Sequence, residues 1–493
     1  MKVFLAGYNV DSEVLEDLKK NSPPREDVTP ETLSAAYARI SRDHRPTNEL
    51  RAAARKEVSR ARRSNRNIIF KMGHHSVAEH AVFNFDIMGV SRLAIEEIEK
   101  FRLCSYTEKS QRYIKLSDDV LLPEEIKRAG MADVFLKTVK AQNALYRSLC
   151  EKLELYVFDK HRDLAEDPKR HSLLKGWAIE DARYVVSLAS EGQLGLTINA
   201  RNLELLVRRF ASKNLTELGR LNQKIYDLVK GVAPSIILFT EASDFDARTY
   251  ADIKAAASTL VDSSISSEDQ PVRLVGFSAD ADTKLVTVLL HSSSALPYEE
   301  CRKNAERLSF EGKKEIVKAA MRHMEFFDSV LREFEFVDLI FELVISATCF
   351  AQLKRHRMAT LTTQNYDPDL GVTIPPSVQN IGAEKDFMEI VSRTNEVYSL
   401  LKEKIPQGAD YVLTNAHRKR TLLKVNAREF YHISRLRGDT TAQWDIRRVV
   451  ARMSELAGEV MPLTCLLIGG KDSYPEVYKS VFGTSPRAVP PKE

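Results

Sequence analysis

The sequence predicts an α+β fold made of two similar domains in tandem. The tripeptide Asn-Ala-Arg occurs at 199–201 and again at 426–428. Each half also opens with a strand-like run, at 2–8 and at 272–278, while helical patterns dominate the rest. With 493 residues, the chain is too long for one ordinary core and long enough for two domains.

A second repeated segment precedes each Asn-Ala-Arg, at 89–113 and at 344–366, and this common order indicates a duplicated domain. The stretch before Pro271 is rich in Ser and Asp, which is typical of a linker. The proline-rich C-terminal end is typical of a frayed tail. We therefore predict a first domain, a linker, a second domain and a tail, at 1–262, 263–271, 272–480 and 481–493.

Periodicity predicts the individual elements. One apolar helix face follows the first Asn-Ala-Arg and comprises Leu203, Leu206, Val207 and Phe210. The run at 285–291 predicts a strand that forms a hairpin with 272–278. The apolar stretch 336–353 contains two acidic residues, which favours a buried helix over a membrane span. The segment 22–32 is typical of a surface loop.

Composition indicates a soluble globular protein, with 43% hydrophobic and 29% charged residues. A net charge of +4 makes no case for nucleic acid by itself. The five cysteines form no C-x-x-C and the N-terminus lacks a signal-peptide pattern, so we expect a cytoplasmic protein in a reducing compartment.

The segment GHHSVAEH at 73–80 is dense in titratable groups. His75, Glu79 and His80 come near a zinc-binding spacing, but no further ligand cluster accompanies them and we predict no metal. Ser76 and Glu79 also have the spacing of a helix capping box.

Two further windows have the side chains needed for anions or nucleobases. Hydroxyl, amide and guanidinium groups gather in 100–113, although a solvated turn could show the same composition. Lys354-Arg355-His356-Arg357 follows the apolar stretch, where it could bind an anion or pair with a helix C-terminus.

Downstream, Arg428, His432 and Arg435 have the spacing of one helix face, and Arg437 would lie on the opposite side of that helix. No dinucleotide-binding or Walker A loop is present, and 467–473 is too short for the latter. The basic run 51–66 could contact nucleic acid, but its pattern is more typical of a solvated helix.

Taken in order, these motifs resemble those of the flavin-dependent thymidylate synthases, once in each half. That family's signature is Arg-His-Arg, seven residues, then Ser. The first half reads Lys100-Phe101-Arg102 but has Ser110, whereas the second has Arg355-His356-Arg357 but Asn365 in place of Ser.

The resemblance implies that surviving residues of the two halves complete one composite site. Arg183 corresponds to Asp410, and Arg437 to Phe210 with Arg208 and Arg209 beside it. The residues implied for dUMP are Gln352, Arg355, Glu108, Ser110, Gln111, Arg112 and Arg183. Those implied for FAD are Ser76, Glu79, Arg355, His356, Arg357, Asn426, Arg428 and His432.

The implied reaction is reductive methylation of dUMP to dTMP, with 5,10-methylenetetrahydrofolate as carbon donor and NADPH as reductant of FAD. Arg437 would be catalytic, because it would face the uracil edge and stabilise the charge that develops there. No cysteine nucleophile is implied, so Cys104 is expected to be a packing residue.

The family resemblance also implies a homodimer that imitates the family's tetramer. Two alternatives stay open: an inactive flavin- or nucleotide-binding homologue, and a nucleic-acid-binding protein that uses 51–66. A membrane partner is not expected.

Overall fold

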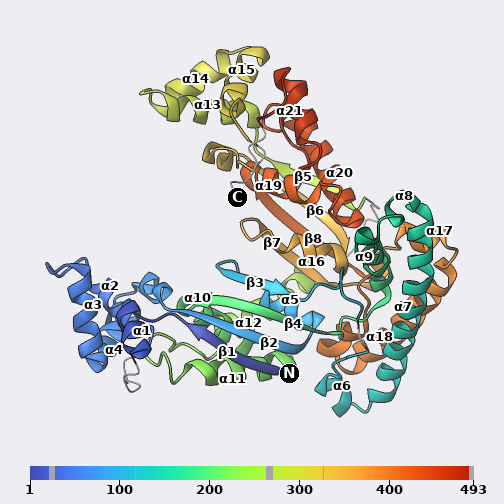
Figure 1. Ribbon diagram of the computed structural model, residues 1–493, viewed down its shortest axis with the longest axis horizontal. Helices are drawn as coiled ribbons and strands as arrows, with labels where there is room; N and C mark the ends of the chain where they lie inside the picture. The colour runs from blue at the N-terminus through green and yellow to red at the C-terminus, as the bar shows by residue number, and fades with distance from the viewer. Residues whose placement is uncertain (21–27, 117, 262–269, 326, 488–493) are drawn as a thin grey trace. The chain divides into compact units, whose positions relative to one another are not determined.

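The computed structural model describes residues 1–20, 28–116, 118–261, 270–325 and 327–487 (Figure 1). The chain divides into two compact units. The first unit comprises Met1–Ile265 and Pro376–Thr414, and the second unit comprises Ser266–Pro375 and Asn415–Glu493. Each unit combines a four-stranded sheet with several helices, which confirms the predicted α+β fold with two similar copies.

The two sheets have the same topology. All neighbouring strands are antiparallel, in the orders β1-β2-β4-β3 and β5-β6-β8-β7. The strands are β1 (Lys2–Tyr8), β2 (Val82–Ser91), β3 (Cys104–Glu108), β4 (Glu191–Asn199), β5 (Val272–Phe277), β6 (Asp338–Ser346), β7 (Thr360–Tyr366) and β8 (Arg418–Asn426). Both opening strands shift register at a corresponding place, before Gly7 and before Gly276, as a duplicated domain requires.

The first unit contains most of the helices. They are α1 (Ser12–Lys19), α2 (Glu31–Arg39), α3 (Thr47–Lys56), α4 (Val58–Asn65), α5 (Arg92–Ile98), α6 (Glu124–Arg128), α7 (Ala132–Lys160), α8 (Arg162–Ala165), α9 (His171–Ala182), α10 (Ala200–Ala211), α11 (Thr216–Val229), α12 (Asp244–Leu260), α17 (Pro376–Asn380) and α18 (Glu384–Lys404). Its short turns are the π-helix η1 (Arg66–Lys71) and the 3-10 helices η2 (His75–His80), η3 (Pro168–Arg170), η4 (Arg183–Val185) and η7 (Pro406–Val412).

The second unit has fewer helices around its sheet. They are α13 (Ala281–Ser293), α14 (Tyr298–Arg307), α15 (Phe310–Met321), α16 (Ala347–Leu353), α19 (Ala427–Arg437), α20 (Trp444–Val460) and α21 (Tyr474–Phe482), with the 3-10 helices η5 (Arg332–Phe336) and η6 (Pro368–Leu370).

The repeated Asn-Ala-Arg is the junction between a strand and a helix in both copies. The side-chain oxygen of Asn199 accepts a hydrogen bond from Asn202 N at 3.0 Å and so caps α10. Asn426 caps α19 in the same way, through Glu429 N at 2.9 Å. An N-cap satisfies a backbone donor that the helix itself cannot pair, which explains why asparagine stands at this turn twice.

The helix face that follows the first Asn-Ala-Arg is buried, as predicted. Leu203, Leu206, Val207 and Phe210 lie in a core that also contains side chains of β2, β4 and α11. In the second unit, Phe430 and Ile433 of α19 enter the corresponding core with side chains of β6 and β8. The alternate residues of a strand and the apolar stripe of a helix therefore meet on one face of each sheet.

The units differ from the predicted domains in one segment. Residues 376–414, assigned by sequence to the second domain, belong to the first unit. There α17 and α18 pack with α7, and Figure 1 shows α7, α9, α17 and α18 together. The Gln142 side chain of α7 donates to Thr394 Oγ1 at 2.8 Å and to the Val412 carbonyl at 2.9 Å. Through these buried bonds, the long helix α7 of the first copy and the long helix α18 of the second copy pack in one core.

Ser187 and Thr414 pair as an isolated antiparallel bridge in this part of the first unit. They stand at the same separation from Asn199 and Asn426, so equivalent positions of the two copies contact each other. Such a contact is the mark of a local pseudo-twofold axis.

Two predicted elements are wrong in form. The run 285–291 lies in the helix α13, and the partner of β5 is β6. Its β-branched residues are accommodated because Leu285, Val286 and Leu289 pack into the core at helical spacing. The stretch 336–353 is mostly the strand β6 followed by the short helix α16, rather than one buried helix.

Other predictions concern the edges of the units. The predicted linker 263–271 lies largely outside the described residues, as do 22–27 of the predicted loop 22–32. The end of that loop is not on the surface, since Glu31 is buried at the start of α2. The predicted tail begins inside α21, which ends at Phe482. Within the described residues, no helix has the length and apolar character needed to cross a bilayer.

Glu217 is a buried carboxylate that joins the two copies inside the first unit. It accepts hydrogen bonds from Ser91 N at 2.7 Å, Ser91 Oγ at 2.6 Å and Tyr411 Oη at 2.7 Å. Burial raises the pKa of Glu217 even though these donors favour its charged form. The carboxylate is thus stabilised by its hydrogen bonds and destabilised by loss of water.

We predict that Glu217→Ala lowers the free energy of unfolding by about 2–4 kcal/mol, because buried donors lose their acceptor. Urea unfolding followed by circular dichroism measures this change. Lys224→Ala, on the exposed side of the same helix α11, is the matched control and should change stability by less than about 0.5 kcal/mol. Equal stability of the two variants would contradict the assigned role of Glu217.

Candidate functional site

The candidate site of the second unit begins at the end of α16. Gln352 and His356 are buried, whereas Arg355 and Arg357 are exposed. The predicted cationic cluster is therefore split between the interior and the surface. Gln352 Nε2 donates to Gln443 Oε1 at 3.2 Å, which holds this turn against the start of α20.

Arg437, the predicted catalytic residue, lies against this turn. Its Nε donates to His356 Nε2 at 3.0 Å and a terminal nitrogen donates to the Gln352 carbonyl at 3.3 Å. Burial lowers the pKa of His356, and the positive charge of Arg437 lowers it further. The structure therefore brings together Gln352, His356 and Arg437 among the residues selected from the sequence.

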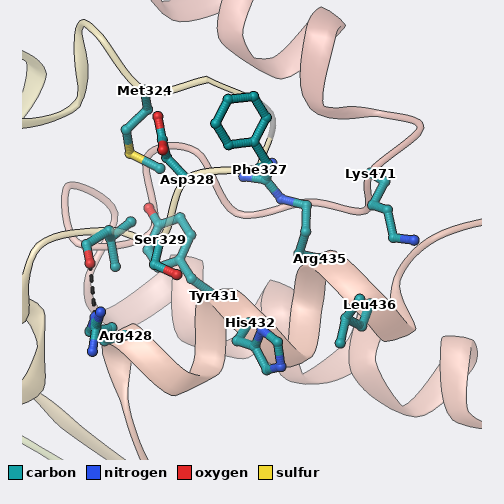
Figure 2. A pocket seen from close by; sticks show the side chains of 11 residues that line it. Met324, Phe327, Asp328, Ser329, Arg428, Tyr431, His432, Arg435, Leu436 and Lys471 are labelled. Atoms are coloured by element: carbon teal, nitrogen blue, oxygen red, sulfur yellow. Dashed lines mark hydrogen bonds between the residues drawn. The ribbon is translucent and has the colours of Figure 1, made fainter. Parts of the chain in front are cut away.

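The predicted polar stripe on α19 lines a cavity of about 300 Å³ (Figure 2). The cavity wall comprises Met324, Phe327, Asp328, Ser329, Val330, Arg428, Tyr431, His432, Arg435, Leu436 and Lys471. Figure 2 shows Tyr431 and Arg435 pointing from α19 toward the segment that contains Phe327 and Asp328. Arg437 is not in this wall, in agreement with its predicted place on another side of the helix.

Each arginine of the stripe has a defined position. Arg428 Nε donates to the Val330 carbonyl at 2.9 Å, and its NH1 pairs with Glu335 at 2.9 Å. The Arg435 guanidinium lies 3.9 Å from the centre of the Tyr474 ring, a cation–π contact. Burial lowers the pKa of Arg435. Cations fixed beside aromatic and apolar walls suit a ligand that is both aromatic and anionic.

Lys471 was missed by the sequence analysis, which considered 467–473 only as a phosphate loop. Its loop is attached to the end of α19, because Thr440 N donates to Asp472 and Asp472 N donates to Asp439, both at 3.1 Å. Phe327 and Asp328 were missed as well. They lie just before η5, which precedes β6 as η2 precedes β2, so a comparison of the two copies could have directed attention to this segment.

In the first unit, the predicted phosphate-binding arginines lie in a buried charge cluster. Arg112 Nε pairs with Glu180 at 2.6 Å, and Arg92 pairs with Glu108 at 2.8 Å. Burial lowers the pKa of Arg183, whose electrostatic neighbours include Glu180, Arg112 and Arg92. Three guanidinium groups and two carboxylates thus lie close together here, largely shielded from water.

The other residues predicted in this region, Ser110 and Gln111, lie in the turn beside Arg112. Ser110 Oγ accepts a hydrogen bond from Arg112 N at 3.1 Å and so shapes the turn. Gln111 is half-buried beside it. Ser110 and Arg112 thus belong to one compact turn next to α9.

The predicted capping box at Ser76 is wrong. The 3-10 helix η2 begins at His75, so Ser76 lies inside it. The N-cap residue of η2 makes no side-chain capping hydrogen bond. Glu79 instead pairs with Arg201 at 2.5 Å. Among the described residues, no group of His, Cys, Asp and Glu side chains is arranged to hold a metal ion.

The first copy uses its counterpart of the α19 face for internal contacts. Glu204 accepts from Leu238 N at 2.7 Å and Phe239 N at 3.1 Å. Asp246, at the start of α12, pairs with Arg208 and Arg209 at 3.0 Å each. Residues of the same unit therefore contact the side chains whose counterparts in the second copy line a cavity.

The basic run 51–66 is partly neutralised within its own unit. Arg51 pairs with Asp11 at 3.1 Å, Arg55 pairs with Asp11 at 2.6 Å, and Arg62 pairs with Glu31 at 2.6 Å. These ion pairs favour a structural role for the run over a nucleic-acid surface.

Comparison with known proteins gives matches in both halves. The sequence model of the family described as thymidylate synthase complementing protein matches residues 26–235 and 273–463. A UPF0159 protein of Thermoplasma acidophilum is 22% identical over 442 residues, which cover 80% of this chain and 86% of that protein. A flavin-dependent thymidylate synthase of Clostridium tetani is 32% identical over 180 residues, 36% of this chain and 70% of that protein.

Among solved structures, the flavin-dependent thymidylate synthase of Helicobacter pylori, complexed with FAD and dUMP, aligns with 49% of this chain and all of that chain. The alignment has a TM-score of 0.31 and 17% identity.

We predict that Gly470→Ala destabilises the loop that presents Lys471. A Cβ at Gly470 would lie 2.6 Å from Asp472 Oδ1 and 2.7 Å from Asp439 N, so backbone must move. Such overpacking costs about 1–3 kcal/mol, measurable by urea unfolding. Gly458→Ala is the control: nothing lies within 4 Å of its Cβ, and alanine in the helix α20 should stabilise by up to about 1 kcal/mol. A neutral Gly470→Ala would show that the loop is not held in this way.

Proposed function

Because the chain belongs to the family of flavin-dependent thymidylate synthases, with two copies of the family's domain in tandem, we propose that it methylates dUMP to dTMP. The observation that supports this proposal most directly is the complementary divergence of the copies. Arg437 lies among polar partners where the first copy has Phe210, and Arg183 is present where the second copy has Asp410. One composite site would combine the surviving residues.

The first copy would bind the nucleotide's phosphate. Arg112 and Arg183 belong to a cluster of buried and half-buried arginines, where charge-assisted hydrogen bonds to a dianionic phosphate would be strong. Glu108 and Glu180 would hold the arginines in orientation, while Ser110 and Gln111 would shape the turn beside the nucleotide.

The second copy would bind FAD and the uracil edge. The α19 cavity offers Arg428, Arg435, His432 and Lys471 beside apolar walls, which fits an aromatic cofactor with a pyrophosphate. Asn426 and the surface residues Arg355 and Arg357 would extend this site, and Ser76 and Glu79 would join it from the first copy. When bound, FAD would supply the reducing equivalents that NADPH delivers.

Arg437 would stabilise the negative charge that develops on uracil as its N3 proton is lost. Its guanidinium is fixed at two nitrogens by His356 and the Gln352 carbonyl, so little reorganisation would be needed during the reaction. Gln352 would also face the nucleotide. The carbon would come from 5,10-methylenetetrahydrofolate.

The protein would act as a homodimer, in which two fused pairs imitate a four-domain assembly. The pairing of equivalent segments around Ser187 and Thr414 supports the idea that the copies associate about a twofold axis.

A binding protein without turnover is the second candidate. Proteins of Thermoplasma acidophilum and Chlamydia muridarum that match across both halves bear the name UPF0159, which states no activity. One assay separates the two functions: the protein is reduced anaerobically and mixed with dUMP and methylenetetrahydrofolate. Oxidation of the flavin together with dTMP formation supports the enzyme, and flavin binding without either supports the second candidate.

We predict that Arg437→Ala lowers the rate of dTMP formation by roughly 10²-fold or more, because a preorganised charge is removed. Release of tritium from dUMP labelled at C5 measures the rate, and retained flavin absorbance shows that the fold persists. Arg208→Ala, in the corresponding helix α10 of the first copy, should stay within about twofold of wild type, since Arg209 still pairs with Asp246. Wild-type turnover in Arg437→Ala would remove this residue from the site.

We also predict one bound FAD per chain. Arg435→Ala should lose flavin by weakening the α19 cavity, whereas Arg208→Ala, the same substitution at the equivalent position of the first copy, should retain it. Flavin absorbance against protein concentration gives the stoichiometry. Two flavins per chain, or equal losses in both variants, would contradict a single flavin site.

A further inference from the structure

Three side chains in the second unit lie in a row: Arg437 is hydrogen-bonded to His356, and the Glu429 carboxylate lies at ion-pair distance from the buried Nδ1 of His356, which has no hydrogen-bond partner among the described residues. Arg437 Nε donates to His356 Nε2 at 3.0 Å. On the other side of the ring, His356 Nδ1 lies 3.5 Å from Glu429 Oε1. His356 and Glu429 are both buried, so solvent does not compete strongly for these contacts.

The first contact determines the protonation state of the imidazole. Arginine has only donors, so His356 Nε2 must present a lone pair to it. The ring proton of neutral His356 is then at Nδ1, the nitrogen that faces the Glu429 carboxylate. The charged and titratable groups around His356 are Glu429, Arg437 and His432, whose ring is 5.6 Å away.

The first copy provides a natural comparison, because all three positions have changed there. Phe101 stands in place of His356, Phe210 in place of Arg437 and Asn202 in place of Glu429. The rings of Phe101 and Phe210 contact each other edge to face, with centroids 6.1 Å apart. The same two positions are thus neighbours in both copies, with an aromatic pair in one and a histidine–arginine pair in the other.

This joint replacement has a physical reason. A histidine beside a phenylalanine at 210 would lose its donor, and an arginine beside a phenylalanine at 101 would lose its acceptor. Each single change would leave a buried polar group without its partner, at a cost of about 1–3 kcal/mol. The residues at 101 and 210, and those at 356 and 437, are therefore either polar together or apolar together.

We propose that Glu429 is a positioning residue that holds His356 as its Nδ1–H tautomer, so that Nε2 accepts from Arg437 and fixes the guanidinium plane. The consequence for turnover rests on the proposed function, in which Arg437 faces the uracil edge. Glu429 itself would touch neither nucleotide nor flavin. Its carboxylate would act through the imidazole, as a second residue often orients a functional histidine.

The tautomer can be measured in the protein without any ligand. In ¹⁵N-histidine-labelled protein at pH 7, ring nitrogen shifts report which nitrogen has the proton, and His356→Gln identifies the His356 signal by its loss. We expect the Nδ1–H form in wild type and in Glu429→Gln, whose amide oxygen can still accept. Glu429→Ala should give a mixture of tautomers. Asn202→Ala, the equivalent position of the first copy, should leave the signal unchanged.

Turnover gives the second measurement. Glu429→Ala should lower kcat for dTMP formation by roughly 10- to 100-fold, as loss of an orienting residue does, with bound flavin retained. Glu429→Gln should stay within about threefold at pH 7. The carboxylate stabilises the imidazolium form, so its removal should shift the acidic limb of the kcat profile of Glu429→Gln to lower pH.

The outcomes separate the two proposals. An Nε2–H tautomer in wild type, or an unchanged His356 signal in Glu429→Ala, would overturn the positioning role whatever the activity. The expected tautomers in a protein that makes no dTMP would overturn the proposed function and leave the Glu429–His356–Arg437 arrangement standing. If Glu429→Ala fails to fold, the wild-type tautomer and the pH profile of Glu429→Gln still test whether Glu429 positions His356.

Discussion

The arrangement of the second unit depends on the capped turn at which β8 becomes α19. Asn426 accepts the Glu429 N–H and ends the strand, so the helix starts at a defined residue. From that start, helical spacing places Arg428, His432 and Arg435 toward the cavity and Glu429 and Arg437 toward His356. A shift of the start by one residue would rotate every one of these side chains by about 100°.

The corresponding turn of the first copy shows that the backbone and core can be kept while the functional side chains change. Asn199 caps α10 with the same geometry, yet the helix presents Phe210 and ion-paired arginines. Backbone and core are retained because they depend on the cap and on an apolar stripe that both copies share. Polar residues outside that stripe changed without loss of the fold, which is how duplicated domains can divide one function between them.

The sequence could predict what depends on local pattern. The opening strands and the apolar face of α10 follow periodicity directly, and the repeated tripeptide identified the two copies, whereas the strands β4 and β8 that precede it were not predicted. The Val and Leu residues of the run 285–291 favour a strand by local preference, but core contacts at helical spacing prevail and the run lies in the helix α13. Lys471 reaches the cavity through bonds between Asp472 and the end of α19, and residues this far apart in sequence leave no periodic signal.

Arginines held in positions of low exposure favour a small anionic ligand over a polyanion. Arg92, Arg112 and Arg183 are buried or half-buried around Glu108 and Glu180, and the α19 cavity has Arg428, Arg435 and Lys471, with Arg428 paired to Glu335. Guanidinium groups in such partly desolvated places are stabilised further by a compact anion such as a phosphate. In the run 51–66, Asp11 and Glu31 already neutralise several arginines. An enclosed anion therefore suits these two groups of arginines better than an extended nucleic acid does, in line with the proposed binding of a nucleotide and a flavin.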